Sequence, residues 1–372
     1  MPSSLRIEQI ELYSSPIKLR EPFIISLGPL HFAENVVVII RTNQGISGIG
    51  ECSPFRTIHG ETMETAMIVG KELAGQLLHS DPLEIEDCIS LMNKLFYSNS
   101  SIKSAFDLAL HDILGKFHNQ PLYKLLGANE SRILFTDYTV SLAPVEKMVA
   151  DAKKIKSEGF KFIKIKLGDS AEKDIERIRR MREAVGMEIP FRIDANQGWN
   201  TDSALKILNE ISSLNIQHCE EPIPRWAFMQ LKSLREKSPI PIMADESCCD
   251  ENDAERLIQL NACDSLNVKL GKSSGIFRAR KILTLAEQAH LPVQMGGFLE
   301  SRIGFTASAH LALSSPAVQF IDFDTPLMFA EDPVEGGIKY GDHGSIQIPD
   351  APGLGVWIDE SYLSRQNKHI IH

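Results

Sequence analysis

Two lysines, Lys164 and Lys166, lie within an apolar stretch, FIKIKLG, that has the pattern of a buried strand. Side chains alternate between the two faces of a strand, so both ammonium groups point the same way. Lys269 lies in a similar stretch, SLNVKLG. Burial and neighbouring cations are expected to lower the pKa of such ammonium groups from about 10.4. A lysine tuned in this way can remove or return a proton near neutral pH.

Three carboxylates, Asp194, Glu220 and Asp245, each follow or close one of three successive apolar runs. A set of oxygen ligands without histidine or cysteine favours a hard cation, and Mg²⁺ keeps open positions for water or substrate. We therefore expect one Mg²⁺ per subunit at these residues. In the alternative, each carboxylate caps the helix that follows it or pairs with a lysine.

The chain must bring these residues together through a repeat of strand and helix. Eight short apolar runs begin roughly 24 to 28 residues apart, which fits one strand plus one crossover helix of a parallel sheet. Eight such units favour a closed barrel over an open doubly wound sheet. The runs span residues 136–143, 162–168, 190–197, 216–222, 240–247, 265–271, 292–298 and 319–326.

In a barrel these charged residues gather at the C-terminal ends of the strands, where barrel enzymes carry out their chemistry. Lys166 and Lys269 belong to the second and sixth strands, which lie opposite each other. A substrate held between them meets one base on each face, so a proton can leave one side of a carbon and return from the other. The alternative for each lysine is a salt bridge at the barrel rim.

The residues before the barrel form a different unit. Residues 35–51 have the pattern of a hairpin that turns at Asn43–Gly45, and residues 104–119 have that of an amphipathic helix. The Gly- and Pro-rich segment 333–356 is expected to return and cover this unit. We therefore divide the chain into an α+β domain at 1–130, a barrel at 131–326 and a returning tail at 327–372.

The composition excludes several classes of function. The 372 residues carry a net charge of −10, whereas binding to nucleic-acid phosphates needs surplus Lys and Arg. No stretch approaches the roughly 20 apolar residues that span a bilayer, and the N-terminus lacks a signal-peptide pattern. The six cysteines show no metal-finger or redox spacing, so reduced thiols in a cytoplasmic protein are expected. The expected partner is a small molecule, and such barrels commonly form symmetric homo-oligomers.

With these residues the chain resembles the enolase superfamily, in particular its muconate-lactonising-enzyme subgroup. The resemblance covers nearly the whole chain and implies an α/β fold, a modified TIM barrel (β/α)7β with an N-terminal α+β capping domain. Superfamily branches that use a catalytic histidine carry it on the seventh strand, here PVQMGGF, which favours the two-lysine subgroup. The motifs that carry the resemblance are KxK at Lys164–Lys166, DAN at Asp194, EEP at Glu220, DES at Asp245 and NVKLGK at Lys269.

Asp322 and Asp324 distinguish among the reactions of this subgroup. Two carboxylates one pleat apart that face the pocket favour a bound cation, unless local lysines neutralise them. The resemblance to dipeptide epimerases implies that this DxD pair holds the free N-terminus of a dipeptide, and that TDYTVS places Thr139 near the substrate. Cycloisomerisation, o-succinylbenzoate synthesis and N-acylamino acid racemisation are the alternatives within the subgroup.

The resemblance also implies a mechanism. The C-terminal carboxylate of the dipeptide meets Mg²⁺ and Lys164, which stabilise the charge that develops when the Cα proton leaves. Lys166 and Lys269 alternate as base and acid, and they interconvert the stereocentre of the second residue through an enediolate.

In this family, specificity for the second residue comes largely from a capping loop, here residues 21–35. Epimerases that act on Ala-Glu have an arginine in this loop, whereas the aligned residue is Gly28, near Ile24. A pocket without a cation leaves a substrate carboxylate unpaired, so a hydrophobic second residue is expected. In the alternative, an L-Ala-D/L-Glu epimerase, His31 or Arg56 supplies the charge. The strand-seven residues that contact the second side chain in the family are here small or apolar: Gly297, Phe298 and Leu299.

Two other classes of protein are considered as alternatives, and each would behave differently in experiments. A Schiff-base aldolase on the same barrel would use Lys269 as the amine nucleophile, would work in EDTA and would be trapped by borohydride. A metal-dependent dipeptide-binding protein would bind its ligand tightly without exchanging the Cα hydrogen.

Overall fold

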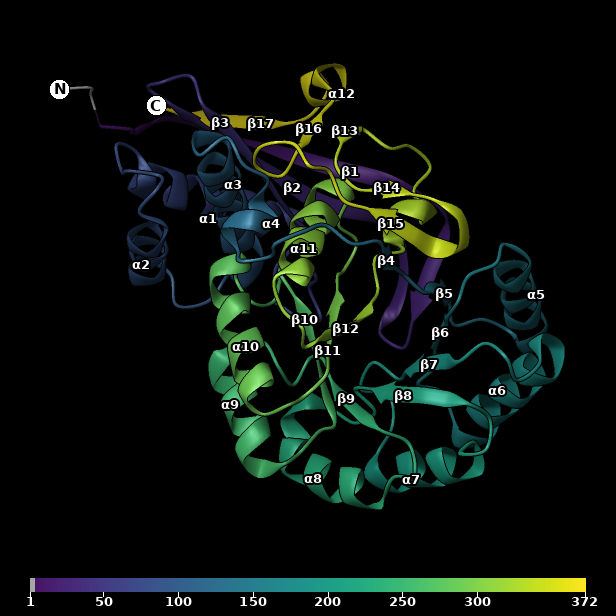
Figure 1. Cartoon of the computed structure of the whole chain (residues 1–372). Helices are drawn as coiled ribbons and strands as arrows, with labels where there is room; N and C mark the ends of the chain where they lie inside the picture. The colour runs from purple at the N-terminus through teal and green to yellow at the C-terminus, as the bar shows by residue number, and fades with distance from the viewer. Residues whose placement is uncertain (1–3) are drawn as a thin grey trace.

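The computed structural model describes residues 4–372. A parallel sheet curls into a barrel in the order β12-β11-β10-β9-β8-β7-β6-β5, and each of the strands β5–β11 is followed by a helix on the outside (Figure 1). The two edge strands meet where the Asp137 amide donates to the Ile321 carbonyl at 3.4 Å. The Phe323 amide also donates to the Thr136 hydroxyl at 2.8 Å. The expected (β/α)7β barrel is confirmed, and the open sheet is excluded.

Each strand overlaps one of the eight apolar runs. They are β5 Tyr138–Val140, β6 Ile163–Lys166, β7 Phe191–Asp194, β8 Ile216–Glu220, β9 Ile242–Ala244, β10 Ser265–Lys269, β11 Val293–Gly296 and β12 Val318–Ile321. The outer helices are α5 Val145–Ser157, α6 Ala171–Val185, α7 Thr201–Glu210, α8 Phe228–Lys237, α9 Glu251–Leu260, α10 Ile276–Gln288 and α11 Arg302–Leu313.

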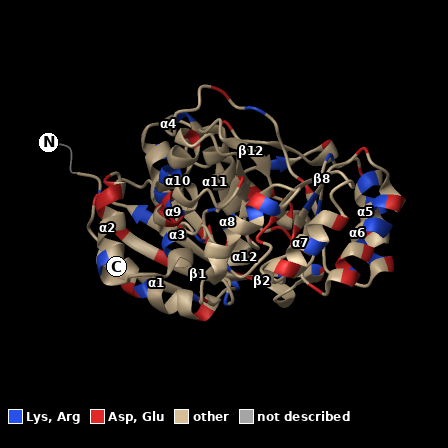
Figure 2. Ribbon diagram, turned by 90° about the horizontal axis from the view of Figure 1, so that it is seen from below, with Lys and Arg blue, Asp and Glu red and all other residues tan. Residues whose placement is uncertain are grey.

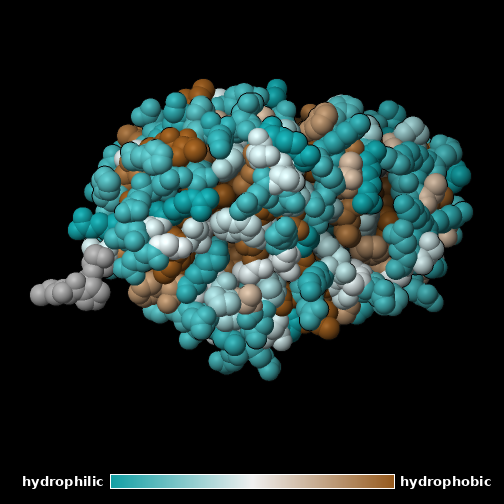
Figure 3. Space-filling view, turned by 90° about the horizontal axis from the view of Figure 1, so that it is seen from above, coloured by the Kyte–Doolittle hydropathy of each residue, from teal (hydrophilic) through white to brown (hydrophobic). Residues whose placement is uncertain are grey.

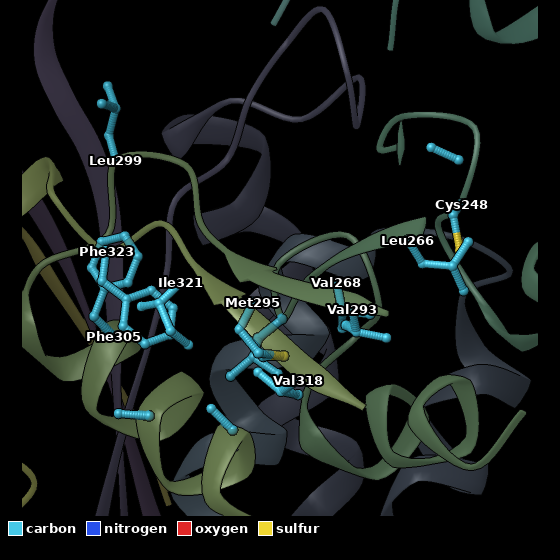
Figure 4. Packing of buried hydrophobic residues seen from close by; sticks show 14 of the residues in the cluster. Cys248, Leu266, Val268, Val293, Met295, Leu299, Phe305, Val318, Ile321 and Phe323 are labelled. Carbon is cyan, nitrogen blue, oxygen red and sulfur yellow. The ribbon is translucent and has the colours of Figure 1, made fainter. Parts of the chain in front are cut away.

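Most of the outer helices are amphipathic, and their apolar stripes pack on the strands, whereas α11 is buried along almost its whole length. On α6 the stripe that includes Ile178 and Met181 is buried, while lysines, arginines and acidic residues cover the exposed faces of α5, α6 and α7 (Figure 2). Asn200 caps α7 by accepting from the Ser203 amide at 2.8 Å. Figure 4 shows how side chains of β10, β11 and β12 gather against the helices, with Val293 and Met295 among them.

The N-terminal domain is an antiparallel sheet with helices packed on it. The sheet has the order β17-β1-β2-β3, and the expected hairpin turn joins β2 to β3. Gly48 and Gly50 let α3 lie directly on β3, because a Cβ at either position would meet an α3 carbonyl oxygen at about 2 Å. The elements are β1 Ile7–Ile25, β2 Gly28–Thr42, β3 Ser47–Cys52, α1 Met63–Leu77, α2 Ile85–Leu95, α3 Ser100–Phe117 and α4 Leu122–Leu125.

Two buried carboxylates of this domain join it to the barrel. Glu51 on β3 accepts from the amides of Ser301 and Gly304 at 3.0 Å, at the start of α11. Asp107 on α3 accepts from the Ile276 amide at 2.5 Å, at the start of α10. Negative charge at a helix N-terminus is favourable because it faces unpaired N–H groups and the positive end of the helix dipole. These contacts hold the N-terminal domain over the barrel.

The C-terminal tail consists of short elements. β17 Lys368–Ile371 pairs with β1 of the N-terminal domain, β13 Val334–Gly336 pairs with β16 Val356–Ile358, and the helix α12 Glu360–Ser364 precedes β17. β14 Lys339–Tyr340 and β15 Ser345–Gln347 form a small sheet with β4 Leu134–Phe135.

The surface in Figure 3 is mostly polar, with small apolar patches. Within residues 4–372, no helix combines the length and the apolar character that a bilayer-spanning helix needs.

Candidate active site

The three carboxylates that the sequence singles out lie together at one end of the barrel. Asp194 ends β7, Glu220 ends the neighbouring β8, and Asp245 directly follows β9. All three are buried, and one oxygen from each lies within 4.8 Å of the others. Adjacent parallel strands that end at the same level bring these side chains to one point.

Neighbouring groups fix the orientation of these carboxylates. Asn267 on β10 and Gln294 on β11 donate to the two oxygens of Glu220, at 2.8 and 3.1 Å. The Asn196 amide donates to Asp194 Oδ1 at 2.8 Å. The sequence analysis did not identify Asn267, Gln294 or Asn196 as site residues, although DAN and NVKLGK contain two of them. The role of Asn267 and Gln294 follows from contacts between strands, which a linear motif does not specify, whereas the Asn196 amide contacts Asp194 two residues earlier in the same motif.

The three lysines contact the same carboxylates. Lys164 Nζ lies 2.8 Å from Glu220 Oε2 and 3.4 Å from Asp194 Oδ2. Lys166 Nζ lies 2.6 Å from Asp194 Oδ2, and Lys269 Nζ lies 2.5 Å from Asp245 Oδ2. In the sheet order β10-β9-β8-β7-β6, the strands of Lys166 and Lys269 are on opposite sides of the barrel. Like charges are therefore kept in the apolar interior because each ammonium has carboxylate partners.

The expectation of lowered lysine pKa values is wrong for two of these residues. Burial would lower the pKa of Lys164, but Asp322, Glu220 and Asp194 outweigh it and raise the pKa well above its ordinary value. Burial would also lower the pKa of Lys269, but the negative charges of Asp245 and Glu220 outweigh it and raise this pKa above its ordinary value. Burial also acts to raise the pKa of Glu220, but the lysines hold it at about 2. Contacts to carboxylates below 3 Å dominate over desolvation here.

Asp322 and Asp324 follow β12 and are also buried. Asp322 Oδ2 lies 2.7 Å from Lys164 Nζ, so the neutralising lysine that the sequence left as an alternative is present. Asp324 Oδ2 accepts from the Thr139 amide at 2.6 Å. Burial and the neighbouring Asp322 raise the pKa of Asp324 to about 7, whereas the pKa of Asp322 is about 2 because Lys164 outweighs its burial.

The three lysines and the two aspartates of the DxD pair line a small cavity of about 50 Å³. Its polar wall includes both base candidates and both aspartates of the DxD pair. The ring of Phe298 lies 4.8 Å from Lys269 Nζ, and that of Phe23 lies 6.0 Å from Lys166 Nζ. The lining residues are Phe23, Ile25, Leu30, Phe55, Ile58, Thr139, Lys164, Lys166, Asn196, Lys269, Gly297, Phe298, Leu299, Asp322, Asp324 and Thr325.

The sequence analysis places Ile24 among the substrate-binding residues. Its neighbours Phe23 and Ile25 line the cavity, whereas Ile24 does not. The reason is the alternation of side chains along β1, which directs Ile24 to the other face of the strand.

Gly28 lines an adjoining cleft of about 380 Å³, which shares Ile25, Leu30, Phe55 and Leu299 with the cavity. Gly28 has a φ of 124°, and a Cβ built on it meets no atom within 4 Å. His31 and Arg56, which could supply a positive charge, line this cleft and are not among the residues around the lysines. The walls shared by the cavity and the cleft are apolar.

The donor set at Asp194, Glu220 and Asp245 fits a hard divalent cation. The ligands are carboxylate oxygens, which Mg²⁺ prefers. Two further oxygens near them, Oδ1 of Asn196 and Oε2 of Glu246, are buried and have no hydrogen-bond partner within the described chain. Burial and Asp245 raise the pKa of Glu246 well above its ordinary value. Two oxygen acceptors without donors beside three carboxylates offer the all-oxygen surroundings that such a cation prefers.

Both parts of the chain match known family models. Residues 8–127 match the mandelate racemase / muconate lactonizing enzyme N-terminal domain, and residues 147–362 match the enolase C-terminal domain-like family.

Individual relatives match over almost the full length. The chain is 54% identical to the D-Ala-D/L-Ala epimerase of Cytophaga hutchinsonii, over 98% of this chain and 100% of the relative. A crystal structure of the dipeptide epimerase from Cytophaga hutchinsonii with Mg and D-Ala-L-Val has a TM-score of 0.98 at 54% identity, over 99% of this chain and 100% of that chain. A crystal structure of the dipeptide epimerase from Enterococcus faecalis, complexed with Mg and L-Leu-L-Tyr, has a TM-score of 0.92 at 34% identity. The match covers 94% of this chain and 99% of that chain.

Proposed function

We propose that this chain, which belongs to the mandelate racemase / muconate lactonizing enzyme family of the enolase superfamily, is a Mg²⁺-dependent dipeptide epimerase. The observation that carries the proposal is a cavity lined by a lysine from each of two opposite strands and by a DxD pair, beside three carboxylates that could hold a metal ion. Only a substrate with both an ammonium and a carboxylate group uses all of these features.

Lys166 and Lys269 exchange the Cα proton of the second residue of the dipeptide. The lysine that acts as base must be a neutral amine, which the bound cation would favour because it would offset the carboxylate charge that raises the pKa of Lys269. This amine removes the proton, and the electron pair of the broken C–H bond is delocalised into the adjacent carboxylate. The other lysine, as an ammonium, returns a proton to the opposite face of the carbon. The product has the inverted configuration, and the two lysines have exchanged protonation states. The positions of the lysines on β6 and β10 support this assignment.

Lys164 and the metal centre act on the C-terminal carboxylate of the dipeptide. Asp194, Glu220 and Asp245 would hold the cation, which when bound offsets the negative charge that develops on that carboxylate. Lys164 Nζ lies between this centre and Asp322, so its ammonium supplies positive charge on the substrate side. Asp322 and Asp324 bind the α-ammonium, and Thr139 positions Asp324 through its amide.

The reaction is tested by hydrogen exchange. A library of Ala-Xaa dipeptides with L-Ala or D-Ala is incubated with the enzyme and Mg²⁺ in D₂O and examined by mass spectrometry. We expect a gain of one dalton at the second residue of the substrates, because the returned hydrogen comes from solvent. An aldolase or a binding protein would leave every dipeptide at its original mass, and that result would reject the proposal.

We also propose that the second residue is hydrophobic. The cavity walls at Phe298 and Leu299 and the residues shared with the adjoining cleft are apolar, and the C. hutchinsonii relative was crystallised with D-Ala-L-Val. A glutamate side chain would lose solvent without gaining a cation. The kcat/KM for Ala-Leu or Ala-Val should exceed that for Ala-Glu by at least about 100-fold. Ala-Met is the control, because the methionine side chain is about as long as that of glutamate but carries no charge. A preference for Ala-Glu over Ala-Met would contradict the proposed specificity.

The pKa of Asp324 predicts a pH dependence of substrate binding. Since this pKa is raised to about 7, only about a tenth of the Asp324 carboxyl is ionised at pH 6, and the ammonium of the substrate lacks one of its partners. We expect kcat/KM to rise from pH 6 to about 7.5 and to fall again once the substrate amine loses its proton, near pH 8. Asp324→Asn should lower kcat/KM and remove the acid limb. If the limb persists in this variant, another group is responsible.

We further propose a cytoplasmic location and a homo-oligomeric state. The six cysteines are free thiols, and all except Cys249 are buried, which suits a reducing compartment. Gel filtration with light scattering tests the oligomeric state.

A further inference from the structure

Lys272, the last residue of NVKLGK, has no part in the proton transfer proposed above. Its side chain is completely buried, and it is not among the residues that line the active-site cavity of the described chain. The chain turns directly after β10, where the Lys272 amide donates to the Lys269 carbonyl at 3.2 Å. This turn directs the Lys272 ammonium back towards the strand end.

The Lys272 ammonium has an acceptor for each of its three donors. Nζ donates to Asp245 Oδ1 at 2.6 Å, to the Asp245 carbonyl at 2.5 Å and to the Asn267 carbonyl at 2.7 Å. A single group thus holds both the side chain and the backbone of Asp245, which fixes the rotamer of this carboxylate. On the other side of the residue, the Asp245 amide donates to Glu221 Oε2 at 2.7 Å.

We propose that Lys272 is a positioning residue that holds Asp245 in the orientation required for metal binding and thereby sets the affinity of the site for Mg²⁺. The inference rests on the metal centre of the proposed function. Lys272 binds Oδ1 of Asp245, so the other oxygen, Oδ2, points to the active site, where Lys269 contacts it. Groups that orient metal ligands strongly affect metal affinity.

A purely structural role would have a different signature. Burying an ammonium costs free energy that an apolar side chain of similar length does not require, so stability alone is a weak reason for this lysine. Lys103 on α3 provides the comparison within the same chain. It is equally buried, but its ammonium donates to Asn93 Oδ1 at 2.9 Å and to the Phe96 carbonyl at 2.5 Å, within the N-terminal domain.

The test is direct titration with Mn²⁺, in which electron paramagnetic resonance measures the free ion. Lys272→Met should bind Mn²⁺ about 10 to 100 times more weakly than the unchanged protein. The matched variant Lys103→Met should lower the melting temperature and leave Mn²⁺ affinity unchanged. At saturating metal, Lys272→Met should retain the KM for the dipeptide, since Lys272 does not line the cavity.

Folded Lys272→Met that binds Mn²⁺ as tightly as the unchanged protein would overturn the inference. If this variant does not fold, Lys272→Gln, which keeps N–H donors without the charge, is titrated against the same criterion. Failure of both variants to fold would mean that Lys272 is a structural residue, and the inference would again be rejected. If the unchanged protein does not bind Mn²⁺, the metal centre of the proposed function is what fails.

Discussion

Lys166→Ala and Lys269→Ala are each expected to lower the rate of epimerisation by at least about 10³-fold, because each variant lacks the base or the acid on one face of the substrate carbon. The remaining lysine can still remove and return the proton on its own face. Each variant should therefore exchange the Cα hydrogen of only one enantiomer of the second residue. Proton NMR in D₂O with both enantiomers of a dipeptide measures this exchange.

The structure indicates that both variants can fold. Asp194 keeps a contact to Lys164 when Lys166 is removed, and Asp245 keeps Lys272 when Lys269 is removed. Lys173→Ala on the exposed face of α6, where Lys173 pairs with Asp169 at 3.2 Å, is the matched control and should retain full activity. Exchange of the same enantiomer by both active-site variants would place the two lysines on one face and refute the mechanism.

Removal of divalent cations with EDTA is expected to lower kcat/KM by at least about 10³-fold, and added Mg²⁺ should restore it. Without the cation, the charge that develops on the substrate carboxylate is stabilised by Lys164 alone among the groups proposed to contact it. Metal analysis of the dialysed protein accompanies the rate measurement. Full activity in a preparation free of divalent ions would contradict the proposed role of the three carboxylates.

Glu220→Gln should cause a comparable loss that millimolar Mg²⁺ does not reverse. Asn267, Gln294 and Lys164 all donate to Glu220, so an amide at this position would direct its own N–H groups at one of these donors. Isothermal titration with Mg²⁺ measures the loss of binding. Glu183→Gln, at an exposed position on α6, is the control and should bind Mg²⁺ normally.

Much of the fold was predictable because parallel barrel strands are buried on both faces and appear as short apolar runs at regular spacing. The run FIKIKLG became β6, and the runs that contain Asp194 and Glu220 became β7 and β8. Once the barrel is inferred, its topology alone brings the C-terminal ends of these strands together. The proximity of Asp194, Glu220 and Asp245 therefore followed from the sequence.

Contacts between distant parts of the chain were not predictable in this way. Glu51 and Asp107 cap helices that begin roughly 170 to 250 residues later. Asn267 and Gln294 orient Glu220 from other strands. Such contacts depend on the register and tilt of packed elements, for which the local pattern of one element contains no information.

The barrel and the residue types at its strand ends could be read from the amino-acid sequence, because strand periodicity and motif spacing are local properties, and the resemblance to the enolase superfamily related them to a two-lysine, metal-dependent chemistry. The three-dimensional arrangement was needed to see that Phe23 and Ile25, but not Ile24, line the cavity, and that carboxylates raise the pKa of Lys164 and Lys269. It also placed Lys272 on Asp245. These outcomes depend on distances of a few ångströms between side chains, since both Coulomb energies and hydrogen bonds change steeply at that range.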